Sequence, residues 1–500
     1  MILFSISLIF LLLHIIFNKS AKANNILVIL SFLFVCSVYV ILAANSYHSI
    51  NFLPKKNLEL YFHTGNFYNW LMTSFFNFKL NLNVDTEFVN YLQNLSPEYL
   101  SNQYLLPMEV KMFYDTSIYN NNIYLYFGIT PILLFYIPFY LITHFFISDQ
   151  IVFLFLSVFI AILQLLIFKK VLLHLIQINI LKENINKYFN APLIIILSLC
   201  NGIPLTYIAI TVHSITILTS IFCSLVALYI FLLLSNNKYK NLKIFLMGLF
   251  LAFAIGARPI SVILTIFIFI AILIIDSKKY IYNSSKFQNF QSSNLIKNYL
   301  CFFMPLIIYG IILAAYNYLR FDSIFNFGFK YQFSPNYTLN ISKNFYFFIE
   351  HLICNVFYPP NFITINPYVI FNNASINNFE PLVGAFIIVP IIISLIKLLK
   401  FNFFKKNKRI FLFIVIITIT SFIYLCIDSY MGSNARFVAE YLSLLLVPSL
   451  VLFYNLIEIV NNDILKNIIK FLFLCFIIFS LYVNMNLINC IILMSKNGLI

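Results

Sequence analysis

The chain has 500 residues, of which 62% are hydrophobic and 9% are charged, and its formal net charge is +15 at pH 7. Soluble domains carry roughly 25% charged residues, so this composition excludes a water-soluble fold. Hydrophobic runs long enough to cross a bilayer recur from end to end, and their unbroken character favours helices over the alternating strands of a transmembrane barrel. The composition therefore predicts an all-α, polytopic integral membrane protein.

Twelve membrane-spanning helices are predicted from these runs, since each is long enough to cross a hydrocarbon core of about 30 Å. The first run lacks the basic start and the small-residue cleavage site of a secretory signal, so we interpret it as a helix. In chain order the predicted spans are Met1–Phe17, Ile26–Ala44, Ile151–Phe168, Ala191–Ile210, Thr211–Leu234, Leu242–Ala257, Pro259–Ile275, Tyr299–Tyr318, Leu382–Leu399, Ile410–Ile427, Tyr441–Val460 and Ile468–Met494.

One further apolar stretch, Ile129–Ile147, contains Pro131 and Pro138 and fits either a span or a segment lying in the membrane interface. Charge decides between the two, because cytoplasmic loops are enriched in Lys and Arg. If the stretch does not span, most of the 31 basic residues and few of the 16 acidic residues fall on one side. We therefore predict an interfacial segment and an external N-terminus. The basic positions on the predicted cytoplasmic side include Lys19, Lys22, Lys169, Lys170, Lys238, Lys240, Lys243, Lys278, Lys279, Arg409, Lys466 and Lys470.

The polar part of the chain is predicted to lie on the external face of a single transmembrane domain, residues 1–500. External loops are expected at 45–150, including the interfacial segment 129–147, and at 319–381 and 428–440. The cytoplasmic connections are shorter. A transporter would more naturally place its polar groups near the membrane midplane, in broken helices or internal repeats. This distribution predicts a functional site on the external surface.

Three of the four arginines, Arg258, Arg320 and Arg436, fall at external helix ends, and only Arg409 is cytoplasmic. A guanidinium can bind a phosphate with two parallel hydrogen bonds and keeps its charge near lipid. The simpler interpretation is that each arginine extends from the membrane rim to water. For the three together we favour a shared anionic ligand.

Asp115 lies in a tyrosine-rich part of the first external loop, between Phe113 and Asn120. An aspartate held above the membrane among aromatic rings could act as a general base or a metal ligand beside a sugar. The alternative is a turn carboxylate within the aromatic belt that many membrane proteins carry at the interface. From these residues alone, the structural interpretation is favoured.

Several short motifs favour a functional interpretation of Asp115 over the structural one. The segment Tyr126–Pro131 reads Tyr-Phe-Gly-x-x-Pro, and a predicted span ends in Lys169 and Lys170. With the first external loop, these features resemble the GT-C superfamily of membrane glycosyltransferases. That superfamily includes the protein O-mannosyltransferases and the aminoarabinose transferases of lipid A, and it moves sugars from polyprenyl-phosphate donors on the external face. Further similar motifs are Gly256–Pro259, Tyr316–Phe321, Asn326–Tyr331, Glu380–Pro381 and Asn434–Phe437.

The resemblance implies an inverting glycosyl transfer. The donor phosphate would be bound by some of the three external arginines, Arg258, Arg320 and Arg436. Such enzymes usually carry an acidic residue soon after the early span, where residues 45–79 offer only Glu59. Asp115 is therefore the expected catalytic carboxylate, with Glu59 as the second candidate. Sugar faces would stack on Tyr119, Tyr124 and Tyr126.

Other partners follow from the same resemblance. The acceptor would be an envelope glycan, lipid or protein, the location the cell membrane, and no nucleic acid is expected. The external histidines are too far apart in sequence to form a ligand motif, so a Mg²⁺ or Mn²⁺ ion, if required, would use carboxylate oxygens. Two alternatives remain open: a lipid or polysaccharide transporter, and a non-catalytic scaffold with a GT-C-like fold.

Overall fold

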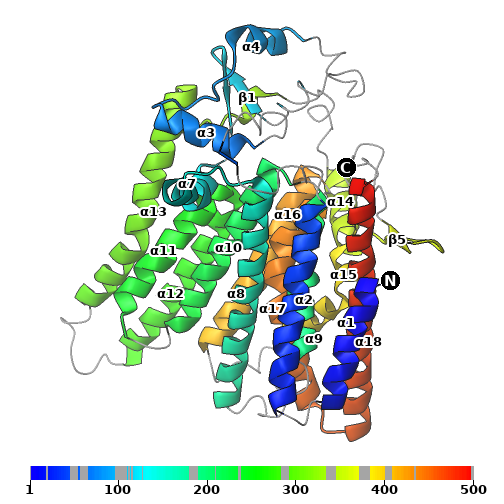
Figure 1. Ribbon diagram of the computed structural model, residues 1–500. Coiled ribbons are helices and arrows are strands. Elements are labelled where there is room, and N and C mark those ends of the chain that lie inside the picture. The colour runs from blue at the N-terminus through cyan, green and yellow to red at the C-terminus, as the bar shows by residue number, and fades with distance from the viewer. Residues whose placement is uncertain are drawn as a thin grey trace.

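The computed structural model is a bundle of long helices with a smaller cap over one end (Figure 1). It describes residues 2–17, 21–45, 55–56, 66–95, 110, 113, 116–126, 128–178, 190–208, 210–234, 238–282, 292–333, 345–366, 368–370, 383–399, 408–432 and 435–496. Within these ranges nine helices are long and apolar enough to cross a membrane. The prediction of a helical, polytopic membrane protein is confirmed at this level.

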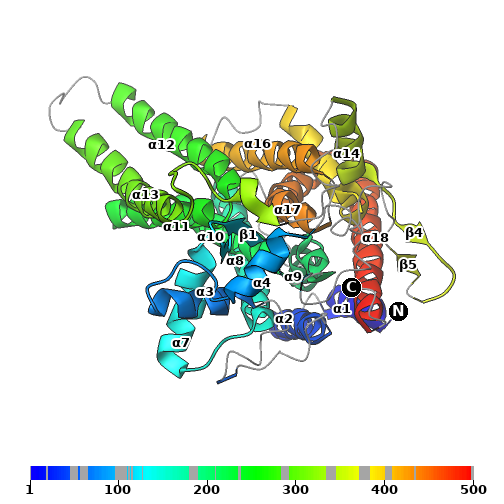
Figure 2. The same ribbon diagram turned by 90° about the horizontal axis from the view of Figure 1, so that it is seen from above.

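The nine long helices coincide with nine of the predicted spans. α10 and α17 are the most buried of them, and they lie at the centre of the bundle when it is seen along its axis (Figure 2). Because a bilayer solvates apolar side chains, the outer helices can expose isoleucine, leucine and phenylalanine, and α13 does so most. The nine are α2 (Ala21–Ala44), α8 (Asp149–Gln177), α10 (Val212–Leu233), α11 (Lys240–Ala257), α12 (Val262–Tyr282), α13 (Ser292–Phe321), α16 (Lys408–Met431), α17 (Ala435–Ile459) and α18 (Asp463–Lys496).

The predicted span Ala191–Ile210 is not one continuous helix. It consists of α9 (Asn190–Leu199) and the 3₁₀ helix η5 (Ile203–Ile208). Between them Gly202 has φ +82°, a left-handed conformation that favours glycine. A Cβ at this position would also lie 2.9 Å from the backbone of Ala439. The break therefore allows close packing against α17, which a run of hydropathy does not reveal.

The other two predicted spans also differ from the long-helix pattern. α1 (Ile2–Phe17) has 16 residues, fewer than a typical spanning helix. The segment Leu382–Leu399 forms α15 (Ala385–Ile388) and the 3₁₀ helix η9 (Pro390–Leu399). Pro390 marks the break, because its ring removes a backbone donor and disfavours a helical conformation in the residue before it. Twelve continuous spans are thus not confirmed.

The cap combines short helices with a three-stranded antiparallel sheet in the order β2-β1-β3. β1 (Thr116–Tyr119) pairs with β2 (Asn122–Tyr124), which follows it directly, and with β3 (Gln332–Phe333), which follows α13. The sheet therefore joins two loops that are far apart in sequence. The helices of the cap are α3 (Phe67–Phe76) and α4 (Thr86–Gln93).

A short helical segment lies at the capped end and corresponds to the predicted interfacial stretch (Figure 1). It comprises the π-helix η3 (Ile132–Tyr136) and α7 (Ile137–Thr143), which together are too short to cross a bilayer. Tyr136 donates a hydrogen bond of 2.5 Å to the buried carboxylate of Asp149 at the start of α8. This bond fixes the segment to the bundle.

The remaining described elements connect the long helices. Two 3₁₀ turns follow α11 and α13, and a short helix and a two-stranded hairpin precede α15. Their bounds are η6 (Pro259–Ser261), η7 (Phe329–Tyr331), α14 (Phe345–Phe357), β4 (Asn361–Phe362) and β5 (Val369–Ile370).

The two ends of the bundle differ in charge. α8, α10, α12 and α17 each begin at the capped end, so the loops that precede them lie there (Figure 1). The opposite end holds Lys169, Lys240, Lys243, Arg409 and Lys470. We call it the lysine-rich end. The grouping agrees with the alternation on which the predicted orientation depends, and the orientation itself stays a prediction.

Cysteine labelling tests this orientation. Lys330, in the cap, and Lys470, at the lysine-rich end, are both exposed. In a background without the native cysteines, an impermeant maleimide should label Lys330→Cys in intact cells and should label Lys470→Cys only after permeabilisation. The reverse pattern would contradict an external cap.

Candidate functional site

Four ionisable residues lie beneath the cap, where α11 and α16 end and α17 begins. We call them the charged cluster: Arg258, Asp428, Arg436 and Glu440. Arg258 Nη2 lies 2.5 Å from Glu440 Oε1. The Arg258 side chain is 20% exposed, whereas that of Glu440 is 4% exposed. Charged groups in spanning helices are costly and commonly mark functional positions, so this pair is the clearest candidate site in the described structure.

The local sequence sets the position of Arg258. α11 ends at Ala257, and Pro259 begins η6. A residue before proline is restricted to extended conformations, and Arg258 has φ −142° and ψ 112°. Burial alone would lower the pKa of its guanidinium, but the carboxylates of Glu440 and Asp428 raise that pKa above its ordinary value. Arg258 is therefore a permanent cation at the helix end.

The first turns of α17 supply the other side of the pair. Arg436 and Glu440 are four residues apart, so they lie on the same side of the helix. Arg436 Nη1 donates a hydrogen bond of 3.1 Å to Thr211 Oγ1, just before α10. The ring of Phe437 lies 5.5 Å from the Arg258 guanidinium carbon. One helix start thus holds Arg436 and orients Arg258.

Asp428 adds a second carboxylate from α16. It is buried, and it lies close enough to Glu440 and Arg258 for their charges to interact. Its Oδ2 has no hydrogen-bond partner among the described residues. A buried, unpaired carboxylate oxygen is energetically costly, and its neighbour Arg258 provides the compensating positive charge.

Segments of the cap reach this cluster. Tyr126 Oη lies 3.3 Å from His213 Nε2, and Gln332 Nε2 donates to Tyr126 Oη over 3.4 Å. Tyr126 is also close enough to Arg258 for an electrostatic interaction. Because Thr211 and His213 flank the start of α10, that helix end contacts both Arg436 and the cap. Polar groups from the cap and from the ends of four helices, α10, α11, α16 and α17, therefore meet at one place.

Two glycines allow the cap to approach the end of α11. A Cβ on Gly128 would overlap the carbonyl oxygen of Gly256. A Cβ on Gly256 would overlap the Tyr309 ring and lie 2.7 Å from Thr130 Oγ1, which itself hydrogen-bonds Tyr309 Oη at 2.7 Å. The close contact ends two residues before Arg258, so it also fixes where the cluster lies under the cap.

Gly256→Ala should therefore destabilise the protein by about 1–3 kcal/mol, the usual cost of overpacking a tight contact. The matched control is Gly310→Ala on α13, where an added Cβ meets no atom within 4 Å of the described structure. That change should be neutral or stabilising, because alanine favours helices over glycine. Thermal unfolding of both variants in detergent measures the difference. Equal midpoints would contradict the close approach.

Arg320, which the sequence places at an exposed rim, is buried, with 3% of its surface exposed. It donates hydrogen bonds to the Leu125 carbonyl oxygen at 2.7 Å and to Asn317 Oδ1 at 2.8 Å. Its guanidinium carbon lies 3.7 Å from the centre of the Tyr316 ring. These contacts connect the cap to α13. The Arg320 guanidinium is thus buried and engaged by α13 and the cap.

Two of the predicted sugar-stacking tyrosines, Tyr119 and Tyr124, contact residues at the end of α13. Tyr119 donates a hydrogen bond of 2.9 Å to Asp322 Oδ2, which raises the pKa of the Tyr119 hydroxyl, and its ring packs on Tyr331. The Tyr124 ring contacts Phe321 edge-on at 5.4 Å. Of the three, Tyr126 lies close enough to Arg258 for an electrostatic interaction.

The chain matches no protein-family model, no curated protein and no solved structure. The case for a site at the charged cluster therefore rests on the contacts and burial of its residues.

The two predicted catalytic carboxylates, Asp115 and Glu59, lie outside the described residues. Phe113 and Thr116, which flank Asp115 in the sequence, are buried in the cap. Within the described part of the chain no group of three or more His, Cys, Asp and Glu side chains could hold a metal ion. The roles of Asp115, Glu59 and a divalent cation stay predictions.

Sequence reasoning missed Glu440, Asp428 and His213 as members of a site. Asp428 and Glu440 are the first and last residues of the predicted external loop 428–440, and the sequence alone gives them no further role. The available signal was the scarcity of acidic residues within apolar helices, since such residues are expensive in a membrane and usually have a partner.

Proposed function

We propose that this protein is a membrane glycosyltransferase that takes its sugar from a polyprenyl-phosphate donor at the capped end. One observation carries the proposal: Arg258 and Arg436 lie in one charged cluster where long apolar helices end beneath the cap. A donor with a long apolar tail and a phosphate headgroup would place its phosphate where the apolar helices end, and cations at that position would bind it. The GT-C-like motifs of the sequence supply the reaction class.

In this proposal the donor enters from the bilayer and its phosphate lies against Arg258 and Arg436. The ion pair with Glu440 engages one terminal nitrogen of Arg258, and a guanidinium has five N–H donors in a planar fork. A phosphate can therefore bind beside Glu440. Glu440 and Asp428 act as positioning residues, because they hold the guanidinium at the rim.

The proposed reaction is a single displacement. The acceptor oxygen attacks the anomeric carbon, its proton passes to a carboxylate, and the bond from that carbon to the phosphate oxygen breaks. The electron pair leaves with the polyprenyl phosphate, and the anomeric configuration inverts. The arginines stabilise the negative charge that develops on the leaving phosphate, where donors have their largest effect. Asp115, with Glu59 as the second candidate, is the proposed carboxylate.

Lipid binding by the purified, full-length protein tests the proposal. Native mass spectrometry would compare a polyprenyl phosphate with the polyprenol of the same chain length. The proposal requires the phosphate form to bind at least tenfold more tightly, since only it engages the two arginines. Equal binding of both lipids would contradict a phosphate site.

A lipid or polysaccharide transporter and a non-catalytic scaffold remain the alternatives. In either case the same cluster would hold a headgroup without bond cleavage, so binding alone does not distinguish them. Chemical analysis of the envelope does.

A further inference from the structure

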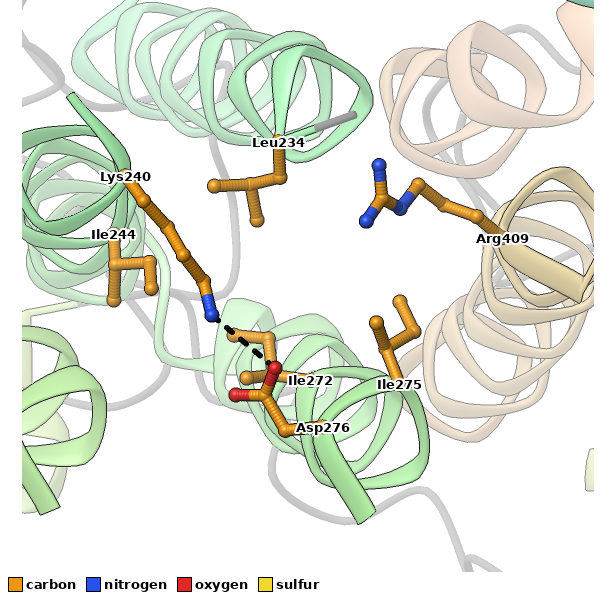
Figure 3. Close-up of a pocket in the computed structure, with 7 residues that line it drawn as sticks. All are labelled: Leu234, Lys240, Ile244, Ile272, Ile275, Asp276 and Arg409. Carbon is orange, nitrogen blue, oxygen red and sulfur yellow. Dashed lines mark hydrogen bonds and ion pairs between the residues drawn. The ribbon is translucent and has the colours of Figure 1, made fainter. Parts of the chain in front are cut away.

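A small cavity lies at the lysine-rich end, on the side of the bundle opposite the cap. Its volume is about 20 Å³, and it is bounded by α10, α11, α12 and α16 (Figure 3). About 10–15 Å³ is enough for one water-sized group. The walls are mostly apolar, formed by Leu234, Ile244, Ile272 and Ile275. The cavity therefore admits a single small polar group, such as one oxygen of a larger ligand.

The charges around this cavity are unequal. Lys240 Nζ lies 3.2 Å from Asp276 Oδ1, and Asn298 Nδ2 donates to Asp276 Oδ2 over 3.2 Å. Both oxygens of the only carboxylate among the lining residues are thus engaged. From the opposite wall the Arg409 guanidinium points into the cavity (Figure 3). Two cations and one carboxylate leave a surplus of positive charge.

The placement of these cations on their helices increases the surplus. Lys240 is the first residue of α11, and Arg409 is the second residue of α16. The N-terminus of a helix carries a partial positive charge, which favours anions and disfavours cations. The preference for basic residues on one side of a membrane would be met equally by exposed side chains such as Lys470. That preference does not explain why the Arg409 side chain points into a cavity between helices.

We propose that this cavity is a phosphate-binding site, in which one phosphate oxygen enters between Lys240 and Arg409 and the rest of the group lies at the bundle end. Basic pockets between membrane helices bind the headgroups of anionic lipids, and an arginine suits phosphate better than a lysine does. The ligand is a lipid headgroup of the adjacent leaflet or free phosphate. The site is independent of the proposed transfer reaction at the capped end.

Thermal unfolding of the full-length protein in neutral detergent tests the site. The probes are dioctanoyl phosphatidylglycerol, dioctanoyl phosphatidylcholine and inorganic phosphate. An anionic ligand that binds the folded state raises the unfolding midpoint, and the dose dependence gives an apparent affinity. We expect stabilisation by phosphatidylglycerol or by inorganic phosphate. The more effective of these two identifies the source.

Three variants make the assignment specific. Arg409→Gln should lower the affinity for the stabilising anion about fivefold. This is the effect of one basic residue near an anionic headgroup. The control Lys470→Gln removes an exposed lysine from the same end and should change the affinity less than twofold. Asp276→Asn should tighten binding, because it removes the carboxylate that engages Lys240. This variant keeps the test valid if Arg409→Gln folds poorly.

The proposal is overturned if neither anion stabilises the wild-type protein more than phosphatidylcholine does. It is also overturned if Arg409→Gln and Lys470→Gln weaken binding equally, since the response would then report general surface charge. Tighter binding by Asp276→Asn together with weaker binding by Arg409→Gln supports it.

Discussion

Asp115→Asn should lower the transfer activity by about 10²- to 10⁴-fold, the usual contribution of a general base, while the protein level stays near normal. Asparagine has nearly the same shape and tolerates the same turns as aspartate, so a structural aspartate would be little affected by this change. Activity would be measured as the amount of sugar on the acceptor in cells that produce the variant, with membrane protein level measured in parallel.

Glu59→Gln is the matched control for Asp115→Asn. If Asp115→Asn is silent and Glu59→Gln is inactive, the catalytic role belongs to the carboxylate nearer the early helix. If both variants keep full activity, the general-base assignment fails for each residue, and a scaffold or transporter gains support.

Arg258→Lys should lower transfer by about 10²- to 10³-fold, because lysine lacks the planar fork that can contact a phosphate twice as charge develops on it. Lysine keeps a positive charge beside the buried Glu440, so folding should be largely preserved. Arg258→Ala would leave that carboxylate without its partner, at a cost of about 3–5 kcal/mol. The lysine variant therefore separates the functional role from the structural one.

Arg320→Lys is the informative comparison. The sequence alone predicts a loss of activity at normal protein level. The hydrogen bonds of Arg320 to Leu125 and Asn317 instead predict a lower unfolding midpoint, because lysine cannot replace both bonds. Wild-type activity of Arg258→Lys, with strong loss for Arg320→Lys at unchanged stability, would show that the wrong arginine has been assigned to the phosphate.

Much of the helical pattern could be predicted from hydropathy, because a bilayer requires long apolar runs wherever a helix crosses it. Breaks in that pattern could not. The break before η5 depends on Gly202, whose positive φ allows backbone contact with Ala439, a residue more than 200 positions away. Such a contact exists only in the folded bundle, and hydropathy alone does not register the break that Asn201, Gly202 and Pro204 introduce in the run.

The candidate site, too, could be predicted only in part from the sequence. The sequence made Arg258, Arg320 and Arg436 candidates, because charge at a helix end is conspicuous in an apolar chain. It could not show that Arg258 pairs with Glu440, or that Arg320 instead binds the carbonyl oxygen of Leu125. All three arginines lie at a predicted helix end in the sequence. Only packing decides which of them is buried and which is partly exposed.

The central claim is that the protein transfers a sugar from a lipid-linked donor, and mass spectrometry of envelope glycans and lipids tests it most directly. The comparison is between cells with the gene, cells without it, and deleted cells supplied with wild-type protein or with Arg258→Lys at equal protein level. The proposed function predicts that one sugar is missing from an envelope acceptor in the deletion, that its polyprenyl-phosphate donor accumulates, and that only the wild-type protein restores the product. Accumulation of a fully built lipid-linked glycan, with no sugar missing from it, would contradict the transferase and indicate a transporter.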